Sequence, residues 1–314
     1  MQLTEVTRNL KARTPRQIHL TFQHPKDKWD DFLGTKLDES SYDQLIEEDC
    51  DVFTPEGKLL LRLRKKCIPG NMALEAFDIL KKIKNKTNNR GMASGKIYMS
   101  NKEVVTKEGR VSKSHGVAKG GEVISAVIGY YDRYPRIPYC RQTAFNANEP
   151  EKFERVLPFI KAVDEAFRTI DPERYAVQYA MVEKTSKDFV IPGTAYTTIT
   201  VNQNFQTAVH TDQGDLKEGL SNILVLRAGQ FQGGNLVFPH YRIAVKLDTC
   251  DLMLFDSHHM HGNTPIFGKV GGYTRVSLVL YYRERMIDCG TAAQELERAK
   301  NRKKGEALYG KVEG

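Results

Sequence analysis

The stretch TAYTTITVNQNFQTAVHTDQGD, residues 194–215, runs from a β-rich segment into a histidine and an aspartate one residue apart, His210 and Asp212. In a strand, side chains at i and i+2 point to the same side, so this pair can aim an imidazole and a carboxylate at one point. Short β-rich runs surround this stretch at close spacing, and they predict an antiparallel sandwich or barrel from about residue 174. The predicted strands are YAVQYAMV (175–182), TAYTTITV (194–201), SNILVLR (221–227), NLVFP (235–239), YRIAVKL (241–247), DLMLFD (251–256) and RVSLVLYYR (275–283), with turns at GQFQGGN (229–235) and FGKVGGY (267–273).

The part of the chain before these runs has helical patterns. NMALEAFDILKKIKNK (71–86) has apolar residues at helical spacing and a basic far end. NEPEKFERVLPFIKAVDEAFRTI (148–170) begins with Pro150 and acidic residues, which is typical of a helix start, and Pro158 predicts a kink or a break. We therefore expect a mainly helical N-terminal half packed around a C-terminal β-barrel, followed by a last helix, TAAQELERAKNRKK (291–304).

The composition is that of a globular protein with a sizeable core: 314 residues, 40% hydrophobic and 27% charged. The longest apolar runs have strand length, well short of the roughly 20 residues of a membrane span, and the first residues lack the apolar core of a signal peptide. The five cysteines are scattered and form no CxxC pair, which favours a reducing compartment and argues against a cysteine zinc site. We expect an intracellular protein, in cytoplasm or nucleus, that does not bind a membrane.

Positive charge is concentrated in two segments of this chain, whose net charge is +8. Residues 57–90 hold ten Lys or Arg against two acidic residues, and RAKNRKK (298–304) is the second basic run. Such clusters suit a polyanion, for example nucleic acid. A plain solvated surface is the alternative interpretation.

A second histidine group follows the predicted strand at 251–256, in FDSHHMHGNTP (255–265), which contains His258, His259 and His261. Two histidines and one carboxylate on one face of a metal leave the other face open, as in the facial triad of non-haem Fe(II) oxygenases. Zinc is compatible with the same residues, although its catalytic sites more often use HExxH or three histidines. Arg275 lies fourteen residues beyond His261, and a guanidinium suits the far carboxylate of a dicarboxylate such as 2-oxoglutarate. A surface hydrogen-bonded pair and a surface arginine are the structural alternatives.

These segments together resemble the TET/JBP dioxygenases, most closely the thymine-hydroxylase module of the base J-binding proteins and related phage and fungal sequences. TNNRGMASG (87–95) and YCRQTAF (139–145) are also similar to segments of that family, so the resemblance covers about residues 85–285. It implies an α+β fold with a double-stranded β-helix (jelly-roll) core and N-terminal helices packed on one sheet. The expected divisions are a helical and basic region (1–85), a dioxygenase core (86–286) and a basic C-terminal helix (287–314), all in one compact unit.

The resemblance also implies the chemistry. Family members use Fe(II), 2-oxoglutarate and O2, with ascorbate as the expected reductant, to oxidise the 5-methyl group of a pyrimidine in DNA. A base in a duplex must be flipped out to be reached. The implied site consists of His210, Asp212 and His261 as iron ligands with His258 as the rival third ligand, Arg275 as 2-oxoglutarate anchor, Arg90 at the cosubstrate or DNA, Asp215 facing the base, Asn202 and Asn204 lining the pocket, and Lys81, Lys82, Lys84 and Lys86 on DNA phosphates.

Several alternatives stay open at this stage. The target base is thymine or 5-methylcytosine, and an acid at Asp215 slightly favours the cytosine amino group. The chain shows neither the cysteine-rich insert of animal TET proteins nor a J-base-binding domain, so we expect a minimal form, with a phage origin conceivable. An amino-acid or protein side-chain hydroxylase of the same fold is the first rival, and a non-catalytic nucleic-acid-binding module is the second. A monomer is the expected state.

Overall fold

The structure is a computed structural model that describes residues 7, 9–87, 90–95, 98–105, 111–117, 122–134 and 137–301. A large sheet forms its centre, with strands in the order β1-β3-β4-β14-β11-β16-β10-β8-β5 and with β9 also paired to β8. Its strands are β1 (Arg16–His19), β3 (Cys50–Phe53), β4 (Leu59–Arg64), β5 (Lys86–Thr87), β8 (Val123–Tyr131), β9 (Arg141–Gln142), β10 (Thr198–Gln203), β11 (Ser221–Gly233), β14 (Leu252–Phe255) and β16 (Ile266–Tyr281).

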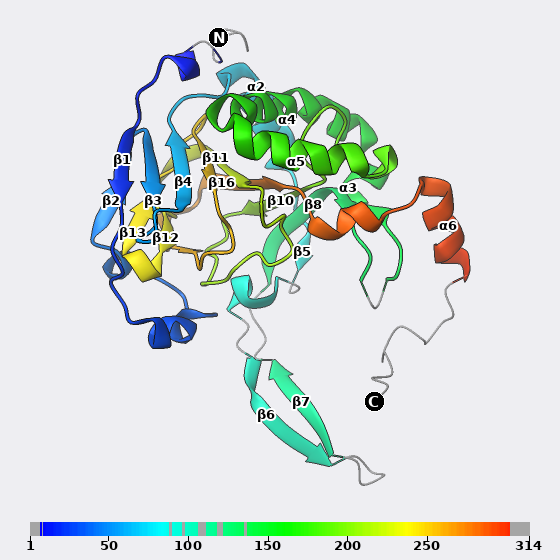
Figure 1. Ribbon diagram of the computed structural model, residues 1–314, viewed down its shortest axis with the longest axis horizontal. Coiled ribbons are helices and arrows are strands. Elements are labelled where there is room, and N and C mark those ends of the chain that lie inside the picture. Colours follow the sequence, from blue (N-terminus) through cyan, green and yellow to red (C-terminus); the bar gives the residue numbers. More distant parts are fainter. Residues whose placement is uncertain are drawn as a thin grey trace.

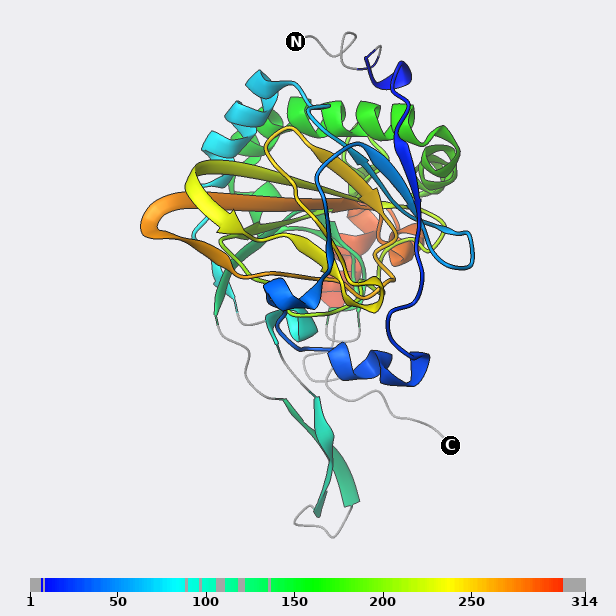
Figure 2. The ribbon, with the colours of Figure 1, turned by 90° about the vertical axis from the view of Figure 1, so that its left-hand side faces the viewer.

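A smaller sheet lies against one face of the large sheet, in the order β15-β12-β13-β2. Its strands are β2 (Gln44–Ile46), β12 (Leu236–Phe238), β13 (Ile243–Val245) and β15 (Gly262–Asn263). The two sheets form the double-stranded β-helix of an α+β fold. A separate hairpin of β6 (Tyr98–Val105) and β7 (Val111–Val117) projects away from the body of the molecule (Figures 1 and 2).

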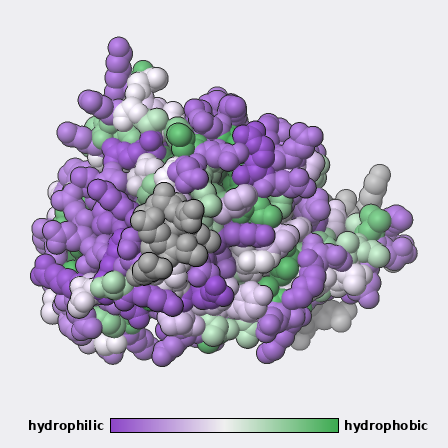
Figure 3. Space-filling view, turned by 90° about the horizontal axis from the view of Figure 1, so that it is seen from above, coloured by the Kyte–Doolittle hydropathy of each residue, from purple (hydrophilic) through white to green (hydrophobic). Residues whose placement is uncertain are grey.

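Helices cover the other face of the large sheet, where α2, α4 and α5 form a layer (Figure 1). The outward face of this layer is mainly hydrophilic (Figure 3), as expected for helices that bury only one stripe. The helices are α2 (Gly70–Leu80), α3 (Ala144–Asn148), α4 (Pro150–Ile170), α5 (Pro172–Lys184) and α6 (Ala292–Asn301), with 3-10 turns η1 (Lys26–Phe32), η2 (Glu39–Ser41), η3 (Gly91–Ser94), η4 (Lys187–Phe189), η5 (Pro239–Tyr241) and η6 (Glu284–Asp288).

The two-residue period of the central strands builds two separate cores. In β14, Leu252 and Leu254 pack toward the helices, whereas Met253 and Phe255 pack toward the small sheet. In β16 the residues at 276, 278 and 280 belong to the helix-side core. The alternate positions 275, 277, 279 and 281 therefore face the space between the two sheets.

The prediction of a strand at YAVQYAMV (175–182) is wrong, because this segment belongs to helix α5. The side chain of Asp171 accepts a hydrogen bond from the backbone N–H of Arg174 and caps the helix, and Pro172 occupies its first turn. Tyr175, Gln178 and Val182 are buried at helical spacing. The local helix start and this spacing outweigh the β propensity of the segment.

The N-terminal part is less helical than the sequence predicts. Strands β1, β3 and β4 extend the large sheet and β2 extends the small one, so the expected helical character is wrong for much of this region. Among the described residues up to 85, helical structure is confined to residues 7 and 9–11, to α2 and to short 3-10 turns. Helix α2 ends at Leu80, and the end of the predicted helix forms β5 instead. Pro158 lies inside the continuous helix α4, so the helix does not break there.

The two predicted turns at 229–235 and 267–273 are wrong in part. Residues 229–233 belong to β11 and residues 267–273 to β16, and these long strands pair as far as Gly233 and Ile266. A register shift at Gln230 lets residues 269–272 bulge from the ladder, which is the local equivalent of the expected turn.

Two of the cysteines are not reduced. Cys140 and Cys289 form a disulfide across a sequence separation of 149 residues, which contradicts the expectation from cysteine spacing. Cys50, Cys67 and Cys250 are free thiols. Among the described helices, none has the length and apolar character needed to cross a bilayer.

Candidate metal centre and cofactor cavity

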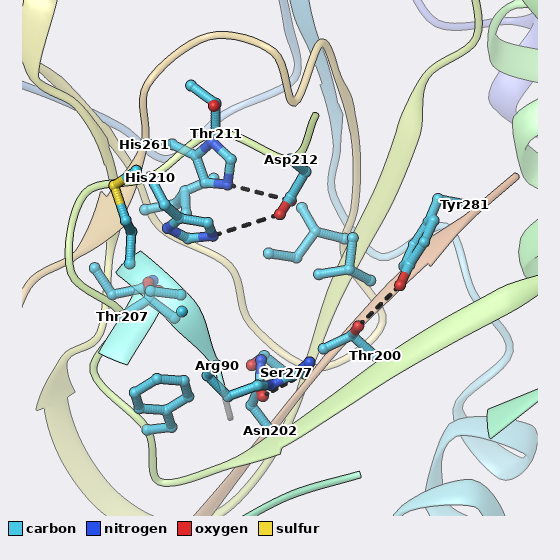
Figure 4. Close-up of a pocket in the computed structure, with 18 of the residues that line it drawn as sticks. Arg90, Thr200, Asn202, Thr207, His210, Thr211, Asp212, His261, Ser277 and Tyr281 are labelled. Carbon is cyan, nitrogen blue, oxygen red and sulfur yellow. Dashed lines mark hydrogen bonds and ion pairs between the residues drawn. The ribbon is translucent and has the colours of Figure 1, made fainter. Parts of the chain in front are cut away.

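A cavity of about 370 Å³ lies between the two sheets. Strands β10, β11, β14 and β16 of the large sheet and β12 and β15 of the small sheet form its walls, and η3 closes one side. Figure 4 shows the histidines and Asp212 at one end, Arg90, Asn202 and Ser277 at the other, and Thr200 with Tyr281 along a side. The volume suits a small organic acid together with part of a larger substrate.

His210, Asp212 and His261 come together at one end of this cavity. One potential ligand atom from each residue lies within 4.8 Å of the others. Asp212 is central: its Oδ1 lies 3.7 Å from Nε2 of His210, and its Oδ2 lies 3.7 Å from Nε2 of His261. An isolated antiparallel bridge between His210 and His261 joins the two segments, which are about fifty residues apart.

Backbone carbonyls orient both imidazoles. Nδ1 of His210 lies 2.8 Å from the carbonyl oxygen of Ala208, and Nδ1 of His261 lies 2.8 Å from that of His259. Since a carbonyl only accepts, each Nδ1 carries the proton and each Nε2 presents its lone pair toward Asp212. Burial, together with the nearby His210, lowers the pKa of His261 to about 4, so its ring is neutral at pH 7. Two imidazoles and a carboxylate on one side form a donor set suited to Fe(II).

The other two histidines of the 255–265 segment point elsewhere. Nδ1 of His258 lies 2.9 Å from Oδ1 of Asp256, and this carboxylate raises the pKa of His258. Nδ1 of His259 lies 3.1 Å from the hydroxyl of Tyr241. Neither belongs to the three-residue cluster, so of the two rivals for the third ligand only His261 has the required geometry.

Arg275 is buried at the end of the β16 row that lines the cavity, although it is not itself a lining residue. Its Nη2 donates to the carbonyl oxygen of Gly234 at 2.9 Å, and the Nδ2 of Asn263, which does line the cavity, donates to the same oxygen at 3.2 Å. A Cβ at Gly234 would lie 2.9 Å from Nε of Arg275, so glycine makes room for the guanidinium.

The charge of Arg275 has no carboxylate partner among the described residues. Burial and the neighbouring Arg227 lower its pKa to about 10, so it is still a cation at pH 7. A buried, unpaired guanidinium is costly unless an anion binds it. This is the electrostatic condition that a dicarboxylate cosubstrate would satisfy.

Arg90 and Asn202 both line the cavity, as the sequence predicts. Nη2 of Arg90 donates to Oδ1 of Asn202 at 3.2 Å, and the hydroxyl of Ser125 donates to the same oxygen at 2.7 Å. The amide oxygen is therefore occupied, which leaves the remaining guanidinium nitrogens and the amide N–H groups as donors toward a ligand.

Asn204 and Asp215 do not have the positions expected from the sequence. Asn204 is exposed, with φ of +48°, and its Oδ1 accepts from the backbone N–H of Arg275 at 2.7 Å. Asp215 is buried and accepts hydrogen bonds from Ser221 and Ser257; burial above all, and then the charge of Asp212, raises its pKa to about 8. Neither residue lines the cavity. Asn204 supports the strand that carries Arg275, and Asp215 lies behind the metal cluster.

The sequence reasoning missed several lining residues. Ser277 and Tyr281 lie on the same face of β16 as Arg275, and the hydroxyls of Tyr281 and Thr200 lie 3.3 Å apart on the wall. The alternation in RVSLVLYY contains this signal, because positions 277, 279 and 281 must share a face with 275. The lining also includes Phe205 and Thr207, for which no pattern in the sequence gives a signal.

The four lysines predicted to hold DNA differ from one another. The ammonium group of Lys81 pairs with Asp78, whereas Lys82, Lys84 and Lys86 are exposed. In the second basic run, Arg298 pairs with the buried Glu295 at 2.7 Å. Residues 302–304 of that run lie outside the described part of the chain.

Comparison with known proteins agrees with this geometry. A family model, Tet_JBP, described as the oxygenase domain of the 2OGFeDO superfamily, matches residues 126–284, or 159 of the 314 residues. Thymine dioxygenase JBP1 of Leishmania braziliensis is 34% identical over 190 residues, which are 59% of this chain and 23% of that protein. The bifunctional helicase and thymine dioxygenase JBP2 of the same organism is 32% identical over 179 residues, 56% of this chain and 16% of the relative.

The chain thus spans less than a quarter of the length of these curated relatives. Among solved structures, NgTET1 in complex with 5mC DNA matches with a TM-score of 0.60 at 12% identity, over 96% of this chain and 97% of the other. At this identity the match establishes a shared fold.

Proposed function

The chain belongs to the Tet/JBP family of 2-oxoglutarate- and Fe(II)-dependent oxygenase domains, and from this premise we propose that it oxidises the 5-methyl group of a pyrimidine in DNA. The observation that carries the proposal is the cluster of His210, Asp212 and His261, whose free nitrogen and oxygen atoms converge at one end of an inter-sheet cavity. A binding module has no need for such a donor set beside a buried, unpaired arginine.

The residues of the site have different roles in this reaction. His210, Asp212 and His261 would hold Fe(II), and the carbonyls of Ala208 and His259 keep both rings in the ligating tautomer. The bound iron, with 2-oxoglutarate and O2, supplies the oxidising power that converts a methyl C–H bond into C–OH.

The buried guanidinium of Arg275 would bind the far carboxylate of 2-oxoglutarate, and Ser277 and Asn263 line the path from it toward the metal cluster. A planar guanidinium binds a carboxylate through two parallel hydrogen bonds, which fixes the orientation as well as the position of the cosubstrate. Gly234 preserves the space that the guanidinium needs.

A target base would enter between the metal cluster and the wall that Thr200 and Tyr281 form. Arg90 and Asn202 offer hydrogen-bond donors to the polar edge of that base, and the surrounding apolar side chains exclude water from the methyl group. The base must leave the helical stack to arrive there. This route explains why the cavity is wider than a small cosubstrate alone requires.

We favour thymine as the base. The two curated relatives described above, at 34% and 32% identity, are named thymine dioxygenases. The sequence argument for 5-methylcytosine depended on Asp215, and that carboxyl group is buried behind the metal cluster, where it accepts hydrogen bonds from two serines. With DNA as substrate, the enzyme works in an intracellular compartment, and we propose ascorbate as reductant and a monomer as the working unit.

Nucleoside mass spectrometry tests the proposal directly. The purified protein is incubated with Fe(II), ascorbate and 2-oxoglutarate on two DNAs, one with and one without 5-methylcytosine, and the digest is examined for hydroxymethylated nucleosides. 5-Hydroxymethyluracil from both DNAs supports thymine oxidation, and 5-hydroxymethylcytosine from the methylated DNA alone moves the substrate to 5-methylcytosine. Succinate without either product retains the iron chemistry and contradicts the DNA substrate.

A further inference from the structure

A second cavity, of about 500 Å³, is lined by residues of β5, β8 and α3. Strands β8 and β5 form one end of the large sheet, with α3 beside β8 (Figure 1). Strand β5 pairs with β8 only at residues 123–124, and β9 pairs with it only at Tyr130 and Tyr131. Between these pairings Ala126 and Val127 line the cavity. A gap in the edge of the sheet therefore creates this hollow, which we call the lysine groove.

The charge of the lysine groove is strongly positive. Its lining includes Lys82, Lys84, Lys86 and Lys152 against a single acid, Glu149. Glu149 pairs with Lys152 at 2.8 Å. The other three lysines are exposed and have no carboxylate partner among the described residues. Three ammonium groups without a salt bridge along one short segment suit a polyanion better than a single small anion.

The groove also has an apolar side. Ile83, Phe145 and Tyr131 also contribute to its lining. A ligand that fits both parts carries negative charge on one side and a flat or apolar surface on the other. A nucleotide within a DNA strand has this combination, since its phosphate is charged and its sugar and base present apolar faces.

The groove and the cofactor cavity share a wall. Ser125 lines the groove, and its hydroxyl donates to Oδ1 of Asn202, which lines the cavity. Ser125 and Asn202 are direct partners in the pairing of β8 with β10. The chain also leads from Lys86 and Thr87 in β5 to Arg90 at the cavity within a few residues.

We propose that the lysine groove holds the nucleotide adjacent to the target nucleotide in the same DNA strand, with its phosphate on Lys82, Lys84 and Lys86. This inference rests on the proposed function and specifies where the substrate strand runs. The shared wall places the neighbouring phosphate in the groove while the target base occupies the cavity. Lys81 has no part in it, because its ammonium group pairs with Asp78.

The test is a scan of single phosphates. Each of three linkages on either side of one target pyrimidine is replaced in turn by an uncharged methylphosphonate. The affinity of each duplex is measured by fluorescence anisotropy with Mn(II) and 2-oxoglutarate present, so that no turnover occurs. For the unaltered protein we expect a loss of about fivefold to tenfold at one or two linkages next to the target on one side, the scale of a single charged phosphate contact.

The same scan on the Lys82→Gln/Lys84→Gln/Lys86→Gln variant decides the assignment. Its affinity for the unmodified duplex should fall, with a salt dependence shallower by about two to three charges. The methylphosphonates that weaken the unaltered protein should have no further effect on it. Thermal unfolding of the variant confirms that it is folded.

The matched control is Lys161→Gln/Lys184→Gln/Lys187→Gln, which removes the same charge from exposed lysines on and next to the helix layer. It should keep the position-specific profile of the unaltered protein. A flat profile in the unaltered protein, or an unchanged profile in the Lys82/84/86 variant, overturns the groove assignment. Formation of an oxidised base on the unmodified duplex is measured in parallel, so a failure of the proposed function is seen separately from a failure of the groove.

Discussion

The metal cluster lies at one end of the cofactor cavity, and the lysine groove lies beyond the Asn202 wall at the other end, yet the two regions are built in opposite ways. In the cluster every ring is oriented by a backbone carbonyl, and His261 is 4% exposed. In the groove Lys82, Lys84 and Lys86 are exposed. Chemistry at a metal requires ligand atoms held at fixed positions, whereas phosphate binding requires only a series of positive charges along the DNA backbone.

The largest effect on activity should come from removing a metal ligand, because such a group must be held at a fixed position. Asp212→Ala should reduce succinate and hydroxymethyl-base formation by at least about a thousandfold, since metal catalysis supplies several kcal/mol of transition-state stabilisation. His261→Ala should behave in the same way, and His258→Ala should retain turnover within a few-fold. The measurement is the initial rate at saturating Fe(II) and 2-oxoglutarate. Loss of activity in His258→Ala with retention in His261→Ala would make His258, in place of His261, the third metal ligand.

Asp164 shows what burial alone does to a carboxylate outside both regions. It is buried between α4 and α5, where it accepts hydrogen bonds from Tyr175 and the backbone of Ala195, and burial raises its pKa to about 6. The native state therefore binds this proton more tightly than the unfolded chain, whose carboxyl has a pKa of about 3.8. The resulting stability is fully present below about pH 4 and is lost as the pH rises through about 6.

The size of this pH effect follows from the shift of the Asp164 pKa. The rise of the Asp164 pKa from 3.8 to about 6 corresponds to a contribution of about 3 kcal/mol to the free energy of unfolding. The free energy of unfolding of the protein and of Asp164→Asn is measured by chemical denaturation at pH 4 to 7. The stability of the protein relative to this variant should be highest at pH 4 and should fall as the pH rises. A difference that stays constant over this range would contradict the assignment.

Arg275 lies between the two extremes, because it is buried but acts through charge. Arg275→Met should raise the KM for 2-oxoglutarate by about 10- to 100-fold, the range expected for a lost charged hydrogen bond. Arg275→Lys should recover part of this loss, since it restores the charge without the planar fork. Initial rates over a 2-oxoglutarate series give both values. An unchanged KM in Arg275→Met would remove the anchor role.

The smallest effect should be that of the groove lysines on the stability of the protein. Lys82→Gln/Lys84→Gln/Lys86→Gln should change the free energy of unfolding by no more than about 0.5 kcal/mol per site, as for surface positions in general. Because three like charges lie in one groove, their removal favours a gain in stability over a loss. Denaturant titration measures it. A loss of several kcal/mol would mean that these lysines are structural and that the contrast with the metal cluster is false.

Local sequence patterns predicted much of the candidate site. His210 and Asp212 share a side because of the two-residue strand period, and Arg275 begins an alternating strand whose pattern also contains Ser277 and Tyr281. The periodicity of short apolar runs likewise predicted most of the central strands. It failed at YAVQYAMV, where a cap at Asp171 and burial at helical spacing decided for a helix.

Contacts between distant segments had no local signal. The Cys140–Cys289 disulfide joins residues 149 positions apart, and two strands of the first 85 residues, β2 and β4, pair with β13 and β14 of the C-terminal half. Asn204 and Asp215 resembled pocket residues in sequence, but backbone direction placed one at the surface and the other behind the cluster. Two residues that are close in sequence can face different spaces when the chain turns between them.

The sequence by itself determined the chemistry of this protein: a His-x-Asp pair, a later histidine group and an arginine on a final strand, in a β-rich frame. The tertiary structure decided which histidine completes the cluster, because the bridge between His210 and His261 selects His261 over His258. It also decided that three of four adjacent lysines line a groove beside the cavity. Side-chain types and strand period are local properties, whereas a metal site and a groove exist only where distant backbone segments pack side by side.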